Sequence, residues 1–287
     1  MLSLYMTIAL TSAASLLIIL LFYRRPRRFF SMALIILFGA VAFYAAESSF
    51  DSGVAKAVDS VKGWIATKPE INNPSSTKKQ YPAIKLKESV LLDVPAISQL
   101  PELERGCEVT SLTMLLRHAG VDVDKTELAK EIKKNGEKRH VIDGVIHYGH
   151  PNEGFVGNMH TRKEYGLGVY HKPVAELAEK YMPNRIKDLT GVHFEELKIP
   201  LSAGKPVWVI INTRYQQLSP NEFETWKTPQ GEIKITYKEH SVLLTGYNQS
   251  YIYFNDPLTG EKNKKAPISN FTEAWVQMGK QAITYLP

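Results

Sequence analysis

Residues 240–257 read HSVLLTGYNQSYIYFNDP and predict two antiparallel strands, 241–247 and 251–255, joined by an Asn-Gln-Ser turn. This hairpin would bring His240, just before the first strand, to the same sheet edge as Asp256, just after the second. A carboxylate at that distance can hold an imidazole in one tautomer. Taken singly, the histidine is also typical of a hydrogen-bonded structural residue, and Asp-Pro of a turn. Their joint spacing favours a functional pair, and whether Asn255 instead orients the histidine stays open.

Outward from this hairpin, helical patterns dominate the earlier part of the domain and strand patterns the later part. A capping box of Asp124 and Glu127 begins one helix, and a long glycine-rich loop is expected at 144–170. Helices first and strands later predict an α+β domain over residues 89–287. The expected helices are 107–118, 124–134, 173–181 and 270–278, and the other expected strands are 90–94, 207–211, 233–237 and 282–286.

Cys107 is the one cysteine of the chain, so no internal disulfide can form. It begins an apolar helix directly after Gly106. The free N–H groups and the dipole of a helix N-terminus favour a thiolate, and a neighbouring imidazole stabilises it further. A lone buried cysteine is often a small core residue instead. The partner His240 shifts the balance towards a nucleophile.

Gln99 lies eight residues before Cys107. Its amide could donate to the oxyanion of an acyl-transfer intermediate, together with the Cys107 N–H, although a surface glutamine is the more common situation. In the glycine-rich loop, Asn158 and Met159 are predicted to border the cleft and contact substrate. No metal or cofactor is expected, because the histidines within or beside the loop match no zinc spacing; they are His147, His150, His160 and His171.

Two uncharged stretches, about 1–23 and 29–46, are each close to the ~20 residues of a membrane-spanning helix. Four arginines in the intervening loop predict a transmembrane hairpin, 1–47, with that loop in the cytoplasm. The remainder of the chain would then be outside a bacterial cell membrane. A cleaved signal peptide in the second stretch is the alternative.

Most of the net charge of +6 comes from the four arginines of this hairpin. Without its four arginines, 31 of the 35 basic residues remain against 29 acidic ones, which gives no support to nucleic-acid binding. Residues 48–88 are predicted to hold a juxtamembrane or stalk helix and then a linker rich in proline and polar residues. A solvated turn is expected at Lys262, Lys264 and Lys265.

Several of these segments together resemble bacterial cysteine peptidases related to the bacteriocin-processing, double-glycine-leader peptidases, which belong to the papain-like superfamily. The similar segments are Leu92-Asp93-Val94-Pro95, Gln99, Gly106 to Leu112, Gly154 to Met159, His240-Ser241-Val242 and Asn255-Asp256-Pro257 with Gly260. The resemblance implies a papain-like fold, with a cysteine helix packed on an antiparallel sheet. It also implies Cys107 as nucleophile, His240 as base, Asp256 as third member and Gln99 in the oxyanion hole.

The chain departs from that family at two positions. Glu108 follows the cysteine, where the leader-processing enzymes usually have a small residue, and their glutamine stands closer to the cysteine than Gln99 does. The expected activity is cleavage of a peptide or isopeptide bond in a peptide or protein substrate, through a thioester. A non-catalytic peptide-binding or sensor module, and a cell-wall amidase or acyltransferase, are the alternatives. The substrate and the oligomeric state stay open.

Overall fold

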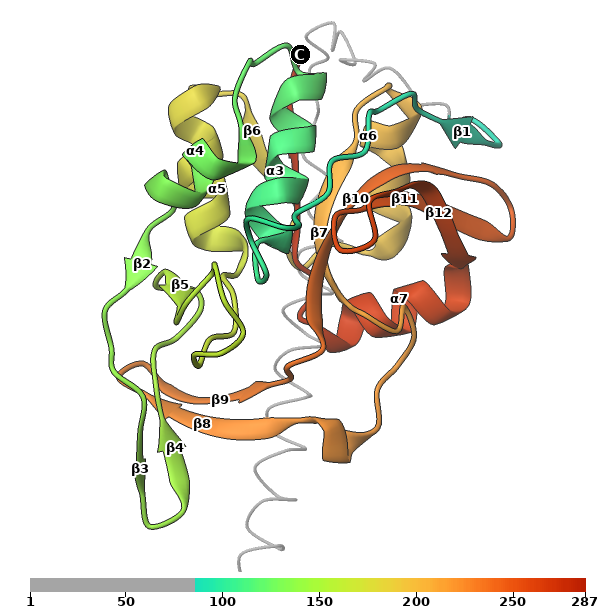
Figure 1. Ribbon diagram of the computed structural model, residues 1–287. Helices are drawn as coiled ribbons and strands as arrows, with labels where there is room; N and C mark the ends of the chain where they lie inside the picture. Colours follow the sequence, from blue (N-terminus) through green and yellow to red (C-terminus); the bar gives the residue numbers. More distant parts are fainter. Residues whose placement is uncertain (1–85) are drawn as a thin grey trace, which may run out of the picture. The chain divides into compact units, whose positions relative to one another are not determined.

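A computed structural model describes residues 86–287, and its central element is a seven-stranded antiparallel sheet (Figure 1). Six of its strands follow one another in a single order, and the seventh, Val90–Leu91 (β1), pairs with the end of β10 outside that order. The order of the six strands is Glu261–Pro267 (β12), Tyr251–Asp256 (β11), Glu239–Tyr247 (β10), Val207–Asn212 (β7), Ala282–Tyr285 (β13) and Ile186–Asp188 (β6).

Helices cover both faces of this sheet, because successive residues of a buried strand point to opposite sides. Leu243 of β10 packs in a core with helices Cys107–His118 (α3) and His171–Tyr181 (α5). Leu244 packs in a second core with helices Lys198–Ser202 (α6) and Ile268–Gln277 (α7) (Figure 1). Strand β10 is buried along its whole length, and its two faces belong to different cores.

A smaller, four-stranded sheet is formed by segments that lie far apart in the sequence. A small core that includes Tyr148 and Trp226 packs against it. Two 3-10 helices, Phe194–Leu197 and Pro220–Glu222, complete the connections. The strand order is His140–Ile142 (β3), Val145–His147 (β4), Glu224–Thr228 (β8) and Gly231–Ile235 (β9), and a separate parallel pair joins Lys134–Asn135 (β2) to Phe155–Val156 (β5).

The α+β prediction is confirmed, and helix α3 has the bounds expected from its apolar pattern. Helix Lys125–Glu131 (α4) ends three residues early, because Lys134 and Asn135 enter β2. Asp124 caps α4 as predicted. Its carboxylate accepts from the Thr126 N–H at 2.9 Å, whereas a capping box would have paired it with the N–H of Glu127. The loop expected at 144–170 contains β4 and β5, which are too short to give a periodic signal.

The solvated turn expected at Lys262, Lys264 and Lys265 is wrong. These lysines belong to β12, at the end of the main sheet, where one edge of a strand has no partner. Charged side chains are common on edge strands because they oppose pairing with other chains. The polar composition therefore concealed a strand.

The predicted transmembrane hairpin, 1–47, and the juxtamembrane helix and linker up to residue 85 lie outside the described residues and stay predictions. Within 86–287, no helix combines the length and the apolar composition that crossing a bilayer requires.

Candidate active site

The candidate nucleophile, Cys107, is the first residue of α3. Gly106 precedes it at a point of close approach, since a Cβ atom there would lie 2.4 Å from the Cβ of Leu103. The Gly106 carbonyl already accepts from the Thr110 N–H, at 3.0 Å. The Cys107 N–H lies in the first helical turn, where N–H groups have no partner within the helix.

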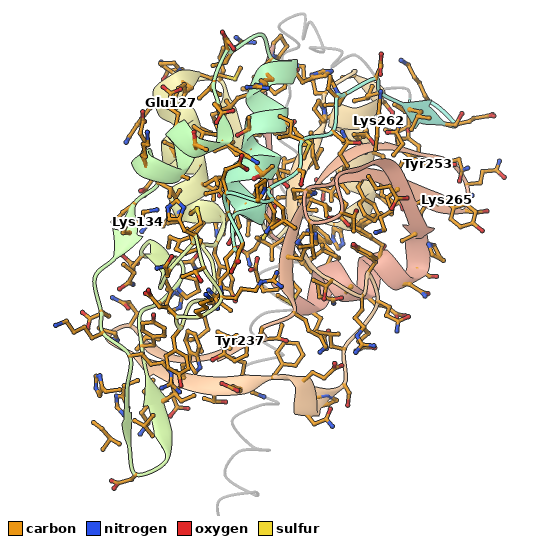
Figure 2. The ribbon with its side chains drawn as sticks, in the orientation of Figure 1. Glu127, Lys134, Tyr237, Tyr253, Lys262 and Lys265 are labelled. Atoms are coloured by element: carbon orange, nitrogen blue, oxygen red, sulfur yellow. The ribbon has the colours of Figure 1, made fainter. Side chains whose placement is uncertain are left out.

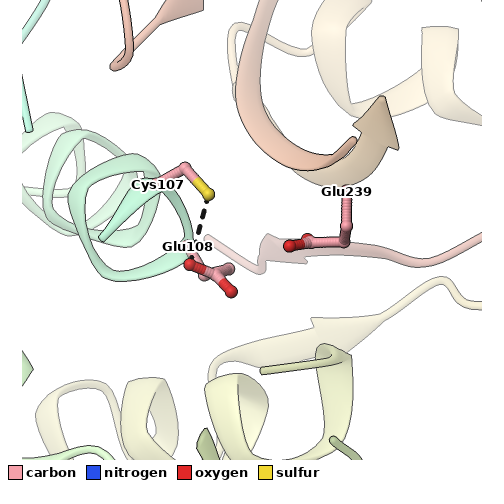
Figure 3. Close-up of side chains that lie close together, drawn as sticks. All are labelled: Cys107, Glu108 and Glu239. Carbon is pink, nitrogen blue, oxygen red and sulfur yellow. Dashed lines mark hydrogen bonds between the residues drawn. The ribbon is translucent and has the colours of Figure 1, made fainter. Parts of the chain in front are cut away.

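Two buried carboxyl groups surround the sulfur of Cys107. The thiol donates a hydrogen bond to Oε2 of Glu108, at 3.2 Å (Figure 3). Glu239, the first residue of β10, approaches from the sheet, and one ligand atom from each of these three residues lies within 4.8 Å of the others. Gly168 makes this packing possible, because a Cβ there would lie 2.1 Å from Oε1 of Glu108 and 2.8 Å from Oε2 of Glu239.

These surroundings favour a protonated thiol. Burial raises the pKa of Cys107 well above its ordinary value, and the charges of Glu108 and Glu239 raise it further. The Ser241 backbone N–H acts in the opposite direction but does not prevent the rise. Burial also raises the pKa of Glu108 to about 7, against a hydrogen bond from the Val169 N–H at 2.7 Å. The low thiol pKa expected at a helix N-terminus is therefore not found, because burial first and the two carboxyl groups second oppose the effect of the helix.

The predicted contact between His240 and Asp256 is present. Nε2 of His240 lies 2.8 Å from Oδ1 of Asp256, and both side chains are buried. Strands β10 and β11 pair so that Leu243 lies opposite Asn255. This register places His240 and Asp256 at the same end of the hairpin. The amide of Asn255 instead donates to the Val94 carbonyl, at 2.8 Å. Asp256 rather than Asn255 therefore contacts the imidazole.

Further donors hold the Asp256 carboxylate. Oδ2 accepts from the Tyr215 hydroxyl at 2.6 Å, from the Thr259 hydroxyl at 3.0 Å and from Nζ of Lys264 at 3.2 Å. Burial alone would raise the pKa of Asp256, but the hydrogen bonds and charge of His240, with those of Tyr215 and Lys264, lower it far below its ordinary value. Asp256 is thus ionised and fixed. No local pattern in the sequence linked Tyr215 or Lys264 to this carboxylate.

The sulfur of Cys107 and the imidazole of His240 lie on neighbouring segments but form no hydrogen bond with each other. Helix α3 packs on β10, where the Ser111 hydroxyl donates to the Ser241 carbonyl at 3.1 Å. The sulfur adjoins the two residues that flank His240 in the chain, the Glu239 carboxyl and the Ser241 backbone. Among the described residues, Cys107 donates to Glu108 and not to His240.

Gln99 links the cysteine loop to the Asp256 turn. Its side-chain amide donates to the Leu103 and Glu104 carbonyls, at 3.0 and 3.1 Å, and its backbone N–H donates to the Pro257 carbonyl at 2.8 Å. Oε1 is buried without a partner among residues 86–287. In this arrangement the amide fixes the loop that leads into α3, and its role towards an oxyanion stays a prediction.

Asn158 and Met159, the predicted substrate contacts, differ in exposure. Met159 retains 2% of its surface and packs in the core of α3, so it offers little area to a ligand. Asn158 organises its own loop, since Oδ1 accepts from the His160 N–H at 2.8 Å and Nδ2 donates to Glu164 at 3.0 Å. Both residues line a hollow in the glycine-rich segment, and contact with a substrate stays a prediction.

The four histidines within or beside that segment have separate environments. His147 stacks on His140, and Nδ1 of His171 lies 2.6 Å from Oδ2 of Asp188. Nδ1 of His150 accepts from a backbone N–H, and His160 contacts the Glu102 carbonyl. Over residues 86–287, the group close enough to share a metal ion is that of Cys107, Glu108 and Glu239, which includes no histidine.

With this geometry established, comparison with known proteins shows that residues 91–283 match the Peptidase_C39-like family. The chain belongs to that family. As a Peptidase_C39-like protein, it is related to the papain-like, bacteriocin-processing peptidases. Membership supports a peptidase-type function of the cysteine peptidase class.

Two relatives place this Peptidase_C39-like chain more closely. It is 44% identical over 200 residues to Uncharacterized protein YvpB of Bacillus subtilis (strain 168), a match that covers 67% of this chain and 74% of that one. The crystal structure of a candidate C39-like peptidase from Bacillus anthracis shares 52% identity, with a TM-score of 0.65, over 70% of this chain and 98% of that one.

Proposed function

We propose that the chain is a cysteine peptidase that cleaves peptide or isopeptide bonds, with Cys107 as nucleophile, His240 as base and Asp256 as the group that holds the base. One observation carries this proposal. In this Peptidase_C39-like chain, His240 and Asp256 form a buried pair, and the two chain neighbours of His240, Glu239 and Ser241, lie next to the sulfur of Cys107.

The reaction begins with attack of the Cys107 thiolate on the substrate carbonyl, which becomes a tetrahedral oxyanion. Collapse breaks the C–N bond, the His240 imidazolium gives its proton to the departing amine, and a thioester remains on the sulfur. Water then attacks the thioester and gives one proton to His240, which passes it to the departing sulfur. The C–S bond breaks, the free thiol forms again, and the acid product leaves as a carboxylate after its remaining proton passes to solvent. Asp256 stabilises the imidazolium in both steps because it stays ionised.

Formation of the thiolate requires the sulfur to exchange partners. In the described arrangement the thiol donates to Glu108, and two carboxyl groups disfavour its ionisation. Entry of the substrate moves the sulfur away from these carboxyl groups and towards the imidazole. The free N–H of Cys107 is then in place to donate to the oxyanion, and Gln99 joins it when its amide releases the Glu104 carbonyl.

A second candidate function is a peptide-binding or sensor module with the same fold. The observation that favours it is the hydrogen bond of Cys107 to Glu108, which keeps the sulfur as a thiol. A cell-wall amidase or acyltransferase would use the same residues on another carbonyl. The uncharged N-terminal stretches support placement of any of these activities at the outer face of a bacterial membrane.

The decisive test is product profiling of peptide libraries and cell-wall material by mass spectrometry, with the wild type, Cys107→Ala and His240→Ala. We expect cleavage products from the wild type that both variants lack. Products from cell-wall material alone would favour the amidase, and amine adducts would favour the acyltransferase. Products that persist in Cys107→Ala, or no products from folded wild type on any substrate, would overturn the peptidase proposal.

A further inference from the structure

A cavity of about 550 Å³, here called the arginine pocket, is lined in part by close chain neighbours of Cys107 and His240. Arg105 stands two residues before Cys107, and Tyr237 stands three residues before His240. In the view of Figure 2, the Tyr237 side chain lies between the β8–β9 ribbon and the rest of the domain. The side chains that carry the argument are Arg105, Arg139, Arg162, Lys163, Tyr165 and Tyr237.

Four cations line this pocket, against two carboxylates, Glu164 and Glu224. Across residues 86–287, none of the four forms a salt bridge. Burial and the nearby charge of Arg162 lower the pKa of Arg105, while the carboxylate of Glu104, its neighbour in the chain, raises it. A pocket with such a surplus of positive charge attracts anions.

The four cations differ in their availability to a ligand. The Arg105 guanidinium donates to backbone carbonyls of the loop, including that of Asn158 at 3.1 Å and that of Glu164 at 2.9 Å. Nε of Arg139 is buried and has no hydrogen-bond partner among residues 86–287. Its guanidinium lies 4.0 Å from the ring centre of Tyr165, and stacking of this kind leaves the edge of the fork available to an acceptor. Among the described residues that line the pocket, Arg139 is therefore the cation with a buried donor that has no partner.

Two exposed tyrosines provide apolar walls. Tyr165 retains 62% and Tyr237 retains 53% of its surface, so both rings are accessible to a ligand. Rings with a hydroxyl edge pair well with a peptide backbone and with flat apolar groups. A volume of about 550 Å³ lies within the range of ligand pockets and has room for more than one side chain.

We propose that the arginine pocket binds a carboxylate of the peptide substrate, close to the bond that is cleaved, with Arg139 as its main partner. The carboxylate belongs either to an acidic side chain or to the end of the peptide chain. This inference names the substrate class of the proposed peptidase and therefore depends on that function.

The first arm of the test is cleavage of a degenerate peptide library by the full-length protein, read by mass spectrometry. Cleaved peptides are expected to be enriched in Asp, Glu or a nearby free C-terminus. For paired Glu and Gln peptides, Arg139→Gln should reduce the acidic-to-neutral ratio of kcat/KM about tenfold. Arg139→Lys should have a smaller effect, because it keeps the charge but not the planar fork. Lys180→Gln, which removes an exposed cation of α5, is the matched control.

The second arm measures binding without turnover. Fluorescent Glu, Gln, free-acid and amidated versions of one peptide are titrated with Cys107→Ala and with Cys107→Ala/Arg139→Gln. Tighter binding of the Glu peptide indicates a side-chain carboxylate, and tighter binding of the free acid indicates a chain end. If the library shows no cleavage but the Glu or free-acid peptide still binds more tightly, the peptidase proposal is wrong and the proposed carboxylate binding by the arginine pocket is retained. Equal binding of all four peptides, or a preference for the carboxylate-bearing peptides that Arg139→Gln leaves unchanged, would contradict the pocket proposal.

Discussion

The sulfur of Cys107 lies 3.2 Å from Oε2 of Glu108, the next residue along α3. Adjacent residues of a helix point about 100° apart, so this contact requires both side chains to turn towards the same buried space. The space is the one between α3, Gly168 and the start of β10, where Glu239 also lies. The same small volume holds the candidate nucleophile and the two groups that suppress its ionisation.

Replacement of Glu108 by Gln should release this suppression. The amide keeps an acceptor for the Val169 N–H and removes the negative charge beside the sulfur. We expect the pH midpoint of thiol alkylation to fall by about one unit or more. The measurement is the rate of iodoacetamide labelling against pH, with Glu176→Gln on the exposed face of α5 as control. A midpoint that rises or stays constant would show that Glu108 does not hold the thiol.

The hydroxyl of Tyr215 should contribute to turnover through Asp256. Tyr215→Phe removes a 2.6 Å hydrogen bond from the carboxylate that holds His240, and we expect kcat/KM to fall about three- to tenfold. Tyr181→Phe is a matched control, because it removes a comparable bond, to Glu131 at 3.0 Å, on the surface. Equal effects of the two substitutions on kcat/KM would contradict a role for Tyr215 in the site. Thermal melting separates loss of function from loss of folded protein.

Stability should depend on pH through Glu108. Its pKa is about 7 in the folded chain and near 4.5 in the unfolded chain, so the folded state holds the proton more tightly. The resulting stabilisation is complete below pH 4.5 and is lost as the pH rises towards 7, by about 3 kcal/mol at most. We expect the free energy of unfolding of Glu108→Gln, from urea titrations at several pH values, to fall less over this interval. A parallel decline in wild type and variant would assign the effect to other groups.

A larger residue at position 168 should destabilise the fold for reasons of space. A Cβ atom at this position would lie 2.1 Å from Oε1 of Glu108, and no positive φ is involved, so Gly168→Ala tests packing alone. We expect a loss of about 1–3 kcal/mol in the free energy of unfolding and a change in the alkylation profile of Cys107. Gly136→Ala is the control, since a Cβ at 136 has no neighbour within 4 Å. A Gly168→Ala protein as stable as the wild type would mean that the carboxyl groups relocate easily.

Local patterns were sufficient for the features that depend on neighbouring residues. The apolar period of residues 107–118 predicts α3, and the hairpin of 240–257 predicts the His240–Asp256 contact, because strand pairing follows from the turn. Strands of two or three residues, such as β2 and β5, were missed because so few positions show no period.

The environment of Cys107 depends on contacts between distant segments. Glu239 approaches the sulfur from β10, and Gly168 of the glycine-rich loop leaves room for the Glu108 and Glu239 carboxyl groups. Tyr215 donates to Asp256 from the segment after β7, and Lys264 donates to it from β12. A pKa depends on burial and on charges a few ångströms away, whatever their separation along the chain. The residue types of a cysteine hydrolase are thus visible in the linear order, whereas the protonation of its sulfur follows only from packing.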